Sequence, residues 1–122
     1  MPLVYRGKVF AGVINDLANI YYSDPSLDGR LGEAEAYLVE LRASNVVSSP
    51  SATVSLESSN ERVNWIVRNG TVISSAIIGT SVLYGAEQGT SSVGGRFARF
   101  GIKLSLLGSA YCELWVAART GA

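Results

Sequence analysis

Histidine is absent from this chain of 122 residues, and cysteine occurs once, as Cys112. Without histidine, Ser-His-Asp and Cys-His catalytic groups and histidine-based metal sites cannot be built. A single cysteine excludes an intrachain disulfide and suits a reducing compartment. Cys112 lies on the predicted inward face of the last expected strand, among apolar neighbours. We therefore expect it to be a small buried hydrophobe and not a nucleophile.

Charged residues are scarce as well. They make up 16% of the chain, against roughly 25% in typical soluble domains, while apolar residues make up 48%. Ten Lys and Arg balance ten Asp and Glu, so the chain has no overall attraction for nucleic acid or an anionic membrane. The apolar content argues against intrinsic disorder. A surface with so little charge suits burial against further copies or a partner, because large exposed apolar patches are rare on monomers.

Long apolar runs are also missing. No stretch approaches the ~20 apolar residues of a membrane helix. Arg6 and Lys8 interrupt the N-terminus, and the apolar run at 9–14 is too short for the core of a signal peptide. We therefore expect a protein that is made and folded in a cytoplasm, without a membrane partner.

What the chain does contain, from residue 31 onward, is apolar and polar residues that alternate with a period of two, as in half-buried β-strands. Asn69-Gly70 predicts a type I′ hairpin turn, because both central residues of that turn need positive φ. Val63, Trp65 and Val67 are predicted to share an apolar face, with Trp65 in the core. The expected strands cover residues 33–43, 53–59, 63–67, 71–78, 81–84, 97–106 and 110–118.

Residues 1–30 are apolar but poorly periodic. Short extended pieces are expected at 3–5 and 9–10, and a helical turn or a short strand at 17–22. The segment is either a first strand plus a loop, or an arm that reaches onto a neighbouring subunit. The pattern leaves both interpretations open. In either case we assign residues 1–30 to the same domain as the body at 31–122.

About seven or eight short strands, with turn signals 8–12 residues apart, predict an all-β fold. We expect an antiparallel β-sandwich of jelly-roll type with an irregular N-terminal segment. No carboxylate pair stands in a catalytic motif. The Gly-rich stretch 85–95 lacks the Lys-Ser/Thr and the helix of a phosphate-binding loop, so it is a candidate for a segment that orders on contact with a partner. We expect no enzymatic activity, metal or cofactor.

A basic group near residue 100 is one candidate for ligand binding. Arg99 and Lys103 share a strand face and Arg96 precedes it, so the three could meet a phosphate, a sialic acid or acidic side chains of a neighbour. We favour a solvated face on which these cations pair across strands with a carboxylate. The carboxylates considered are Glu40, Glu57 and Glu113.

Aromatic side chains supply the second candidate group. Trp115 and Tyr111 alternate on the strand face that also carries Glu113. If that face points outward, they form an aromatic patch suited to a sugar ring or a protein interface. The full candidate interface comprises Leu3, Tyr5, Phe10, Tyr21, Tyr22, Tyr84, Gly89, Tyr111 and Trp115.

Two passages carry a resemblance to a known fold. Residues 52–65, ATVSLESSNERVNW, resemble the strand-turn-Trp segment of discoidin-like, galactose-binding-type jelly rolls. Residues 95–104, GRFARFGIKL, look like the penultimate strand of those domains. Together the passages cover about a fifth of the chain. The resemblance implies a carbohydrate-binding β-sandwich module, with Trp115, Tyr111 and Arg99 as the ligand contacts.

In its length, neutral charge and Ser/Gly-rich composition, the chain also resembles the small jelly-roll decoration (cement) proteins of tailed-bacteriophage capsids. This resemblance implies a non-enzymatic structural protein on the virion surface, added after assembly in the host cytoplasm. Its partners would be the major capsid protein and further copies of itself, for example in a trimer, and not nucleic acid. Of the two functions we favour the decoration protein, with carbohydrate binding as the alternative.

Overall fold

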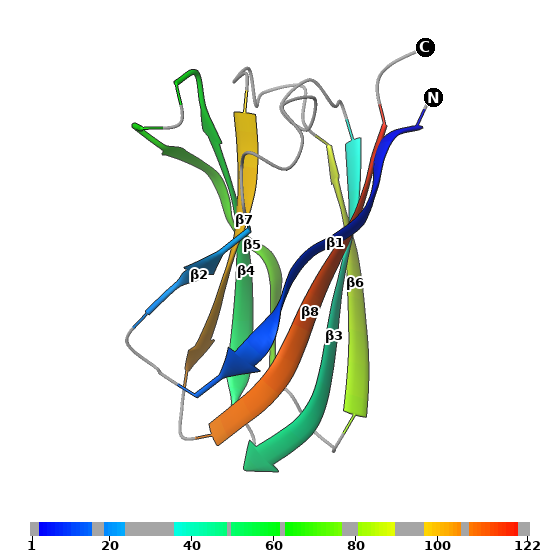
Figure 1. The fold of residues 1–122 in the computed structure, drawn as a ribbon, viewed down its shortest axis with the longest axis vertical. Coiled ribbons are helices and arrows are strands. Elements are labelled where there is room, and N and C mark those ends of the chain that lie inside the picture. The colour runs from blue at the N-terminus through cyan, green and yellow to red at the C-terminus, as the bar shows by residue number, and fades with distance from the viewer. Residues whose placement is uncertain are drawn as a thin grey trace.

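The computed structural model describes residues 3–15, 19–23, 36–48, 50–61, 63–76, 81–89, 97–105 and 108–119. Within these ranges the chain forms eight β-strands and no helix, so no described segment could cross a membrane as a helix (Figure 1). The strands are β1 (Leu3–Ile14), β2 (Tyr21–Tyr22), β3 (Ala36–Ser48), β4 (Ser51–Ser59), β5 (Ile66–Ala76), β6 (Ser81–Gly89), β7 (Phe97–Ser105) and β8 (Gly108–Arg119).

The strands form two antiparallel sheets, which stand on opposite sides of the molecule in Figure 1. Sheet A has the order β1-β8-β3-β6, and sheet B has the order β2-β7-β4-β5. Consecutive strands in the chain lie in different sheets, except β4 and β5, which are neighbours in sheet B. Each sheet buries one face against the other. The expected all-β fold, an antiparallel β-sandwich, is confirmed.

The core lies between the sheets. The ring of Tyr37 on β3 meets that of Phe100 on β7 edge-on, with centroids 5.3 Å apart and planes at 89°, an arrangement that aromatic pairs favour. Burial raises the pKa of the Tyr37 phenol. The predicted burial of Cys112 is confirmed, and this burial raises the pKa of its thiol to about 11, so the thiol is protonated at neutral pH.

The alternation predicted for the last two strands is also confirmed. On β7 the inward side chains are fully buried, while Lys103 points outward and is exposed. On β8 the buried positions alternate with half-buried ones on the outer face of sheet A. The buried residues of these strands are Ala98, Phe100, Ile102, Leu104, Ala110, Cys112, Leu114, Val116 and Ala118.

The N-terminal segment is more regular than predicted. β1 is one strand of 12 residues that pairs with β8 along its length. Its register shifts between Leu3 and Tyr5 and again between Lys8 and Phe10. Each shift interrupts the period of two, which is why the sequence shows no clear alternation there. The short pieces expected at 3–5 and 9–10 are thus joined into one continuous strand with two local irregularities.

The hairpin predicted at Asn69-Gly70 is not formed, because both residues lie inside β5. Leu56 on β4 faces Asn69, whereas Val54 faces Ile73, so β5 carries extra residues at this point and forms a bulge. Asn69 Oδ1 accepts a hydrogen bond from the Thr71 backbone nitrogen at 2.9 Å. The Asn-Gly signal marks a local distortion, and pairing with β4 makes that distortion a bulge instead of a turn.

The apolar face predicted for residues 63–67 does not point into the core either. Val63 is 76% exposed and Val67 is 58% exposed. Trp65 is half-buried and contacts Arg99 on the outer face of sheet B. A short apolar run has the same pattern whether or not another layer covers it, so the sequence could not distinguish these cases.

Gly101 on β7 leaves space for the short strand β2 at the edge of sheet B. It lies on β7 directly opposite Tyr22 on β2. A Cβ atom at Gly101 would lie 2.9 Å from Ile20 Cγ2 and 3.0 Å from Tyr22 Cε1. Beside it, the Ser23 and Phe100 backbones are joined by a hydrogen bond of 2.8 Å from the Ser23 nitrogen to the Phe100 oxygen. The missing side chain at 101 therefore lets Tyr22 lie across the sheet.

Candidate functional site

Aromatic and charged side chains gather in two places, one on the outer face of each sheet. The sheet B cluster consists of Tyr22, Glu57, Trp65 and Arg99. The sheet A cluster consists of Lys8, Arg42, Tyr111, Glu113 and Trp115. Within the described ranges, no group of three or more Cys, Asp or Glu side chains is placed to hold a metal ion.

The sheet B cluster centres on an ion pair between neighbouring strands. Glu57 on β4 and Arg99 on β7 are direct cross-strand partners. Nε and Nη2 of Arg99 both donate to Glu57 Oε1, at 2.9 and 2.7 Å. The Tyr22 hydroxyl donates to the other oxygen, Oε2, at 3.4 Å. The Glu57 side chain is only 8% exposed, so this pair is shielded from solvent.

Two aromatic rings flank the same guanidinium. Arg99 Cζ lies 3.7 Å from the centroid of the Tyr22 ring and 4.2 Å from that of Trp65. Such contacts stabilise a cation, more strongly when it is shielded from water. The prediction that the basic face pairs across strands is thus confirmed for Arg99. Lys103 lies four residues after Arg99 on the same outer face of β7 and is exposed. Arg96 lies outside the described residues.

The sheet A cluster is organised around the carboxylate of Glu113. The Trp115 indole Nε1 donates to Glu113 Oε1 at 3.0 Å, and the Tyr111 hydroxyl donates to Oε2 at 3.2 Å. Lys8 on β1 forms an ion pair with Oε2 at 3.5 Å. The indole hydrogen bond, followed by the charge of Lys8, lowers the pKa of Glu113. The ionised carboxylate therefore holds both aromatic side chains in place.

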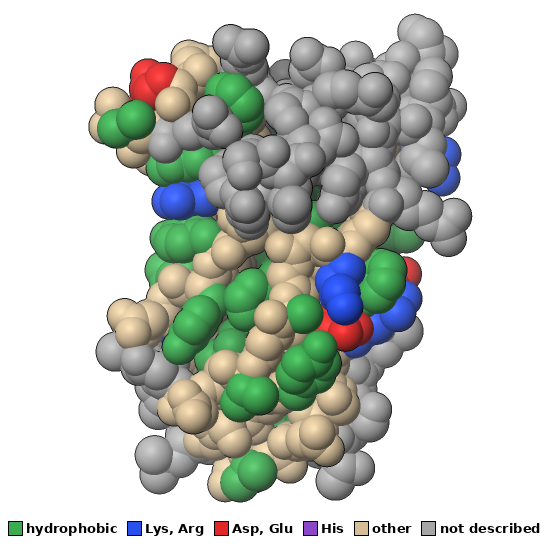
Figure 2. Space-filling model, in the orientation of Figure 1, with side chains coloured by type: hydrophobic (Ala, Val, Ile, Leu, Met, Phe, Trp, Pro, Cys, Tyr) green, Lys and Arg blue, Asp and Glu red, His purple; other side chains and the backbone are tan. Residues whose placement is uncertain are grey.

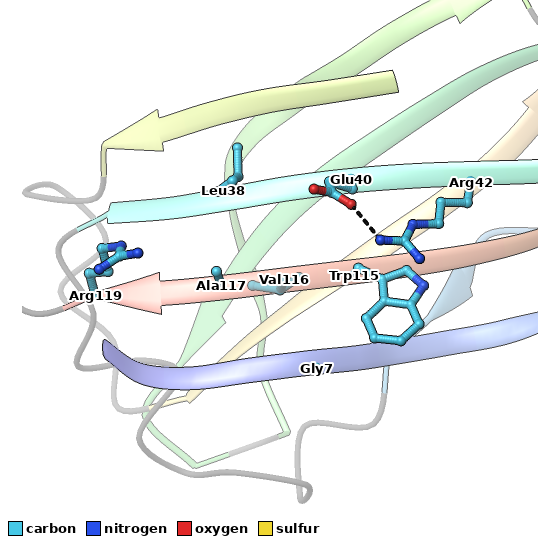
Figure 3. Close-up of a pocket in the computed structure, with 8 residues that line it drawn as sticks. All are labelled: Gly7, Leu38, Glu40, Arg42, Trp115, Val116, Ala117 and Arg119. Carbon is cyan, nitrogen blue, oxygen red and sulfur yellow. Dashed lines mark hydrogen bonds and ion pairs between the residues drawn. The ribbon is translucent and has the colours of Figure 1, made fainter. Parts of the chain in front are cut away.

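A hollow of about 290 Å³ opens beside Trp115 on the outer face of sheet A (Figure 3). Arg42 Cζ lies 4.5 Å from the indole centroid, and Arg42 Nη2 donates to Glu40 Oε2 at 3.0 Å. β3, β8 and β1 all contribute to the lining. The lining residues are Gly7, Leu38, Glu40, Arg42, Trp115, Val116, Ala117 and Arg119. This hollow, with an aromatic wall and charged rim, is the candidate functional site.

The linkage between Glu113 and folding gives a testable pH dependence. Because its pKa is lowered in the folded state, ionised Glu113 stabilises the fold above its unfolded pKa, and this stabilisation is lost as pH falls through the folded pKa. We expect Glu113→Gln to lower the free energy of unfolding near neutral pH, and the difference from wild type to shrink below about pH 4. Urea unfolding at both pH values measures this. An equal difference at both would contradict the assignment.

The other interface candidates occupy different surroundings. Phe10 and Tyr21 are half-buried at the margin of the core, with ring centroids 6.2 Å apart. The sheet B cluster contains Tyr22, and the sheet A cluster contains Tyr111 and Trp115. Four candidates lie on β1 or β6 at positions whose side-chain surroundings are outside the described part of the structure. These are Leu3, Tyr5, Tyr84 and Gly89.

The sequence did not indicate which side chains from distant strands complete each cluster. Nothing in the sequence placed Glu40 and Arg42 beside Trp115, which lies more than seventy residues away in the chain. Similarly, no pattern indicated that Tyr22 and Trp65 flank Arg99. Comparison with protein-family models, with curated proteins and with solved structures found no match.

Proposed function

We propose that this chain is a non-enzymatic structural assembly protein, a decoration (cement) protein of a tailed-bacteriophage capsid. It would bind the shell, and further copies of itself, through apolar surface. The observation that carries the proposal is a group of exposed apolar side chains at and just before the start of β5, which we call the β5 tip. Val63, Ile66 and Val67, the residues of the β5 tip, are 76%, 57% and 58% exposed.

The β5 tip is apolar on both faces of an edge strand. Val67 lies opposite Glu57 and Ile66 lies opposite Ser58 on β4, so the two side chains point to opposite faces. Strands with apolar residues on both faces are usually covered on both faces. An edge strand also presents backbone N–H and C=O groups for pairing, and charged residues are one of the features, together with bulges, that protect native edges. In β5 the only charged residue is Arg68.

The remaining surface agrees with a role in assembly. In the view of Figure 2, hydrophobic side chains are spread over the lower half of the visible face, and charged ones gather at its margin. Fully burying one large apolar side chain contributes about 1.5–3 kcal/mol. Three such side chains on each partner would therefore supply enough energy for a moderate interface.

The strand order supports the jelly-roll interpretation. Two four-stranded sheets, joined by connections that cross between them everywhere except at β4–β5, are the arrangement expected of two interleaved Greek keys. Jelly rolls occur in viral capsid proteins as well as in lectins. Fold alone does not assign a function, so the proposal depends on the exposed surface.

Self-association is the first test. Sedimentation velocity of the purified protein at micromolar concentration should show oligomers that dissociate on dilution. We expect Ile66→Lys and Val67→Lys each to weaken association at least about tenfold, because a buried lysine must lose its hydration. Val47→Lys is the matched control, since Val47 is 59% exposed on β3 and belongs to the other sheet. A wild-type monomer at all concentrations would contradict self-association.

Shell binding is the second arm of the same test. Shells assembled from the major capsid protein of the same genome should retain the wild-type chain on co-sedimentation. The two β5-tip variants should bind less than Val47→Lys. Wild-type protein that stays in the supernatant would overturn the capsid assignment, even if the chain self-associates.

A further inference from the structure

The Asn69-Gly70 pair lies in the bulge of β5 and does not form the hairpin turn that its sequence predicts. We propose that it is a site of spontaneous modification, at which the folded protein loses the side-chain amide of Asn69 and gains a carboxylate. Asparagine is among the thermolabile residues, and Asn69 is the one asparagine of the chain that a glycine follows. The proposal does not depend on the assembly role, because the reaction needs only these two residues and water.

The reaction begins when the Gly70 backbone nitrogen attacks Cγ, the side-chain carbonyl carbon of Asn69. A bond forms between this nitrogen and Cγ, the bond from Cγ to Nδ2 breaks, and the proton of the attacking nitrogen leaves with Nδ2 as ammonia. Water then opens the resulting cyclic imide at either of its two carbonyl carbons. One opening gives aspartate, and the other gives isoaspartate, whose main chain runs through Cγ. In total one water is consumed and one ammonia is released.

The missing side chain at Gly70 has no conformational or packing role in the fold. The φ angle of Gly70 lies outside the left-handed region that favours glycine. A Cβ atom at this position would lie 3.9 Å from Val67 Cγ1, an ordinary van der Waals distance. Gly70 is also exposed, so water reaches the pair. What the missing Cβ does provide is an unhindered approach between the Gly70 nitrogen and the Asn69 side chain.

The Asn69 side chain is turned back along the chain in an Asx turn. Its Oδ1 accepts hydrogen bonds from the Thr71 backbone nitrogen at 2.9 Å and from the Thr71 hydroxyl at 3.5 Å. The hydrogen-bonded ring of this turn includes the Gly70 nitrogen, so the side-chain amide is held beside the group that attacks it. The same two donors withdraw electrons from Cγ, and they stabilise the negative charge that develops on Oδ1 during the attack.

The bulge also leaves room for the product. The register passes from the Val54–Ile73 pair to the Leu56–Asn69 pair, so Gly70 belongs to the extra residues of β5. Extra residues in a bulge stand outside the regular ladder. The backbone at Gly70 can therefore move towards Cγ, and the additional main-chain atom of isoaspartate can be accommodated, without breaking regular pairing. We expect the modified chain to keep the sandwich fold.

Peptide mass mapping of the native protein, kept at neutral pH and physiological temperature, tests the proposal. Trypsin cleaves after Arg68 and Arg96, and Asn69 is the only asparagine in the peptide 69–96. We expect this peptide to gain, over time, the single mass unit by which aspartate exceeds asparagine, and to separate into aspartate and isoaspartate forms on chromatography. A sample digested at the start corrects for conversion during digestion.

Gly70→Ala is the matched variant, because the fold has space for the added Cβ while the attack is hindered. We expect its conversion to be at least about tenfold slower than that of the wild type, with an unchanged circular dichroism spectrum. Asn60 and Asn64 are internal controls. Both are exposed, whereas Asn69 is half-buried, but neither is followed by glycine. We expect both to stay unmodified over the same period.

Three results would each overturn the proposal. Conversion in urea without conversion in the native protein would show that the bulge protects Asn69, and this comparison does not depend on the folding of any variant. Equal rates for the wild type and Gly70→Ala would show that the Gly70 nitrogen is not the attacking group. Equal conversion at Asn60 or Asn64 would show that exposure, and not the Asn69-Gly70 geometry, determines the reaction.

Discussion

Arg99→Ala is expected to lower the free energy of unfolding by about 3 kcal/mol, because it leaves a shielded carboxylate without its partner. The Glu57 side chain is 8% exposed and accepts both described hydrogen bonds from Arg99 on one oxygen. The truncation also removes the surface on which the rings of Tyr22 and Trp65 pack. Chemical denaturation of both proteins at neutral pH gives the difference.

A second ion pair on the other sheet provides the matched control. Arg42 pairs with Glu40 at 3.0 Å and contacts Trp115, but the side chains of the pair are 48% and 32% exposed. Exposed pairs contribute about 0–1 kcal/mol, so Arg42→Ala should have a small effect. Arg99→Lys should lie between wild type and Arg99→Ala, because lysine keeps the charge but not the planar guanidinium. Equal losses for Arg99→Ala and Arg42→Ala would show that shielding the Glu57–Arg99 pair from solvent does not increase its contribution to stability.

Phe100→Ala is expected to cost about 4 kcal/mol, the range found when a fully buried aromatic side chain is removed from a core. Phe100 is completely buried in the space between the sheets, and its ring meets Tyr37 edge-on. Phe100 of sheet B packs directly on Tyr37 of sheet A, so the side chains around it are constrained by both sheets. They can therefore fill only part of the cavity that the substitution leaves. Thermal and urea unfolding both measure the loss.

Phe10→Ala is the comparison for the core substitution. Phe10 is half-buried at the margin of the core, against Tyr21, so less apolar area is exposed when its ring is removed. The loss should therefore be clearly smaller than for Phe100→Ala. If the order of the two losses is reversed, the packing between the sheets differs from that described.

These contacts explain how a chain with few charges keeps its outer faces ordered. On each sheet one carboxylate binds a cation and at least one aromatic hydroxyl or indole from other positions. The aromatic side chains therefore do not need to be buried between the sheets to be fixed. Surface that is fixed in advance loses less entropy when a partner covers it, which suits the proposed assembly.

Periodicity alone predicted the parts of the fold where pairing is regular. β4, β7 and β8 alternate without interruption over most of their length, so the sequence identifies their inward residues, including Phe100 and Cys112. It also indicated that Arg99 would pair with a carboxylate across a strand, and named Glu57 among three candidates. These features depend on residues close together in the chain, where the geometry of a strand determines which side chains share a face.

Only the tertiary structure shows where the bulges lie. A shift of register in β1 and an insertion in β5 change which residues face inward, and a period-two pattern cannot show this. At Asn69-Gly70 the same two residues could serve a turn or a bulge, and the pairing of β5 with β4 selected the bulge.

In the end, the sequence by itself determined the fold class of this protein, which is all-β, and the inward faces of its regular strands. Only the tertiary structure brought Tyr22, Glu57, Trp65 and Arg99 into one cluster, and Arg42 beside Trp115. The physical reason is that these contacts depend on strand order and register. Both are set by packing over the whole chain, between segments far apart in sequence.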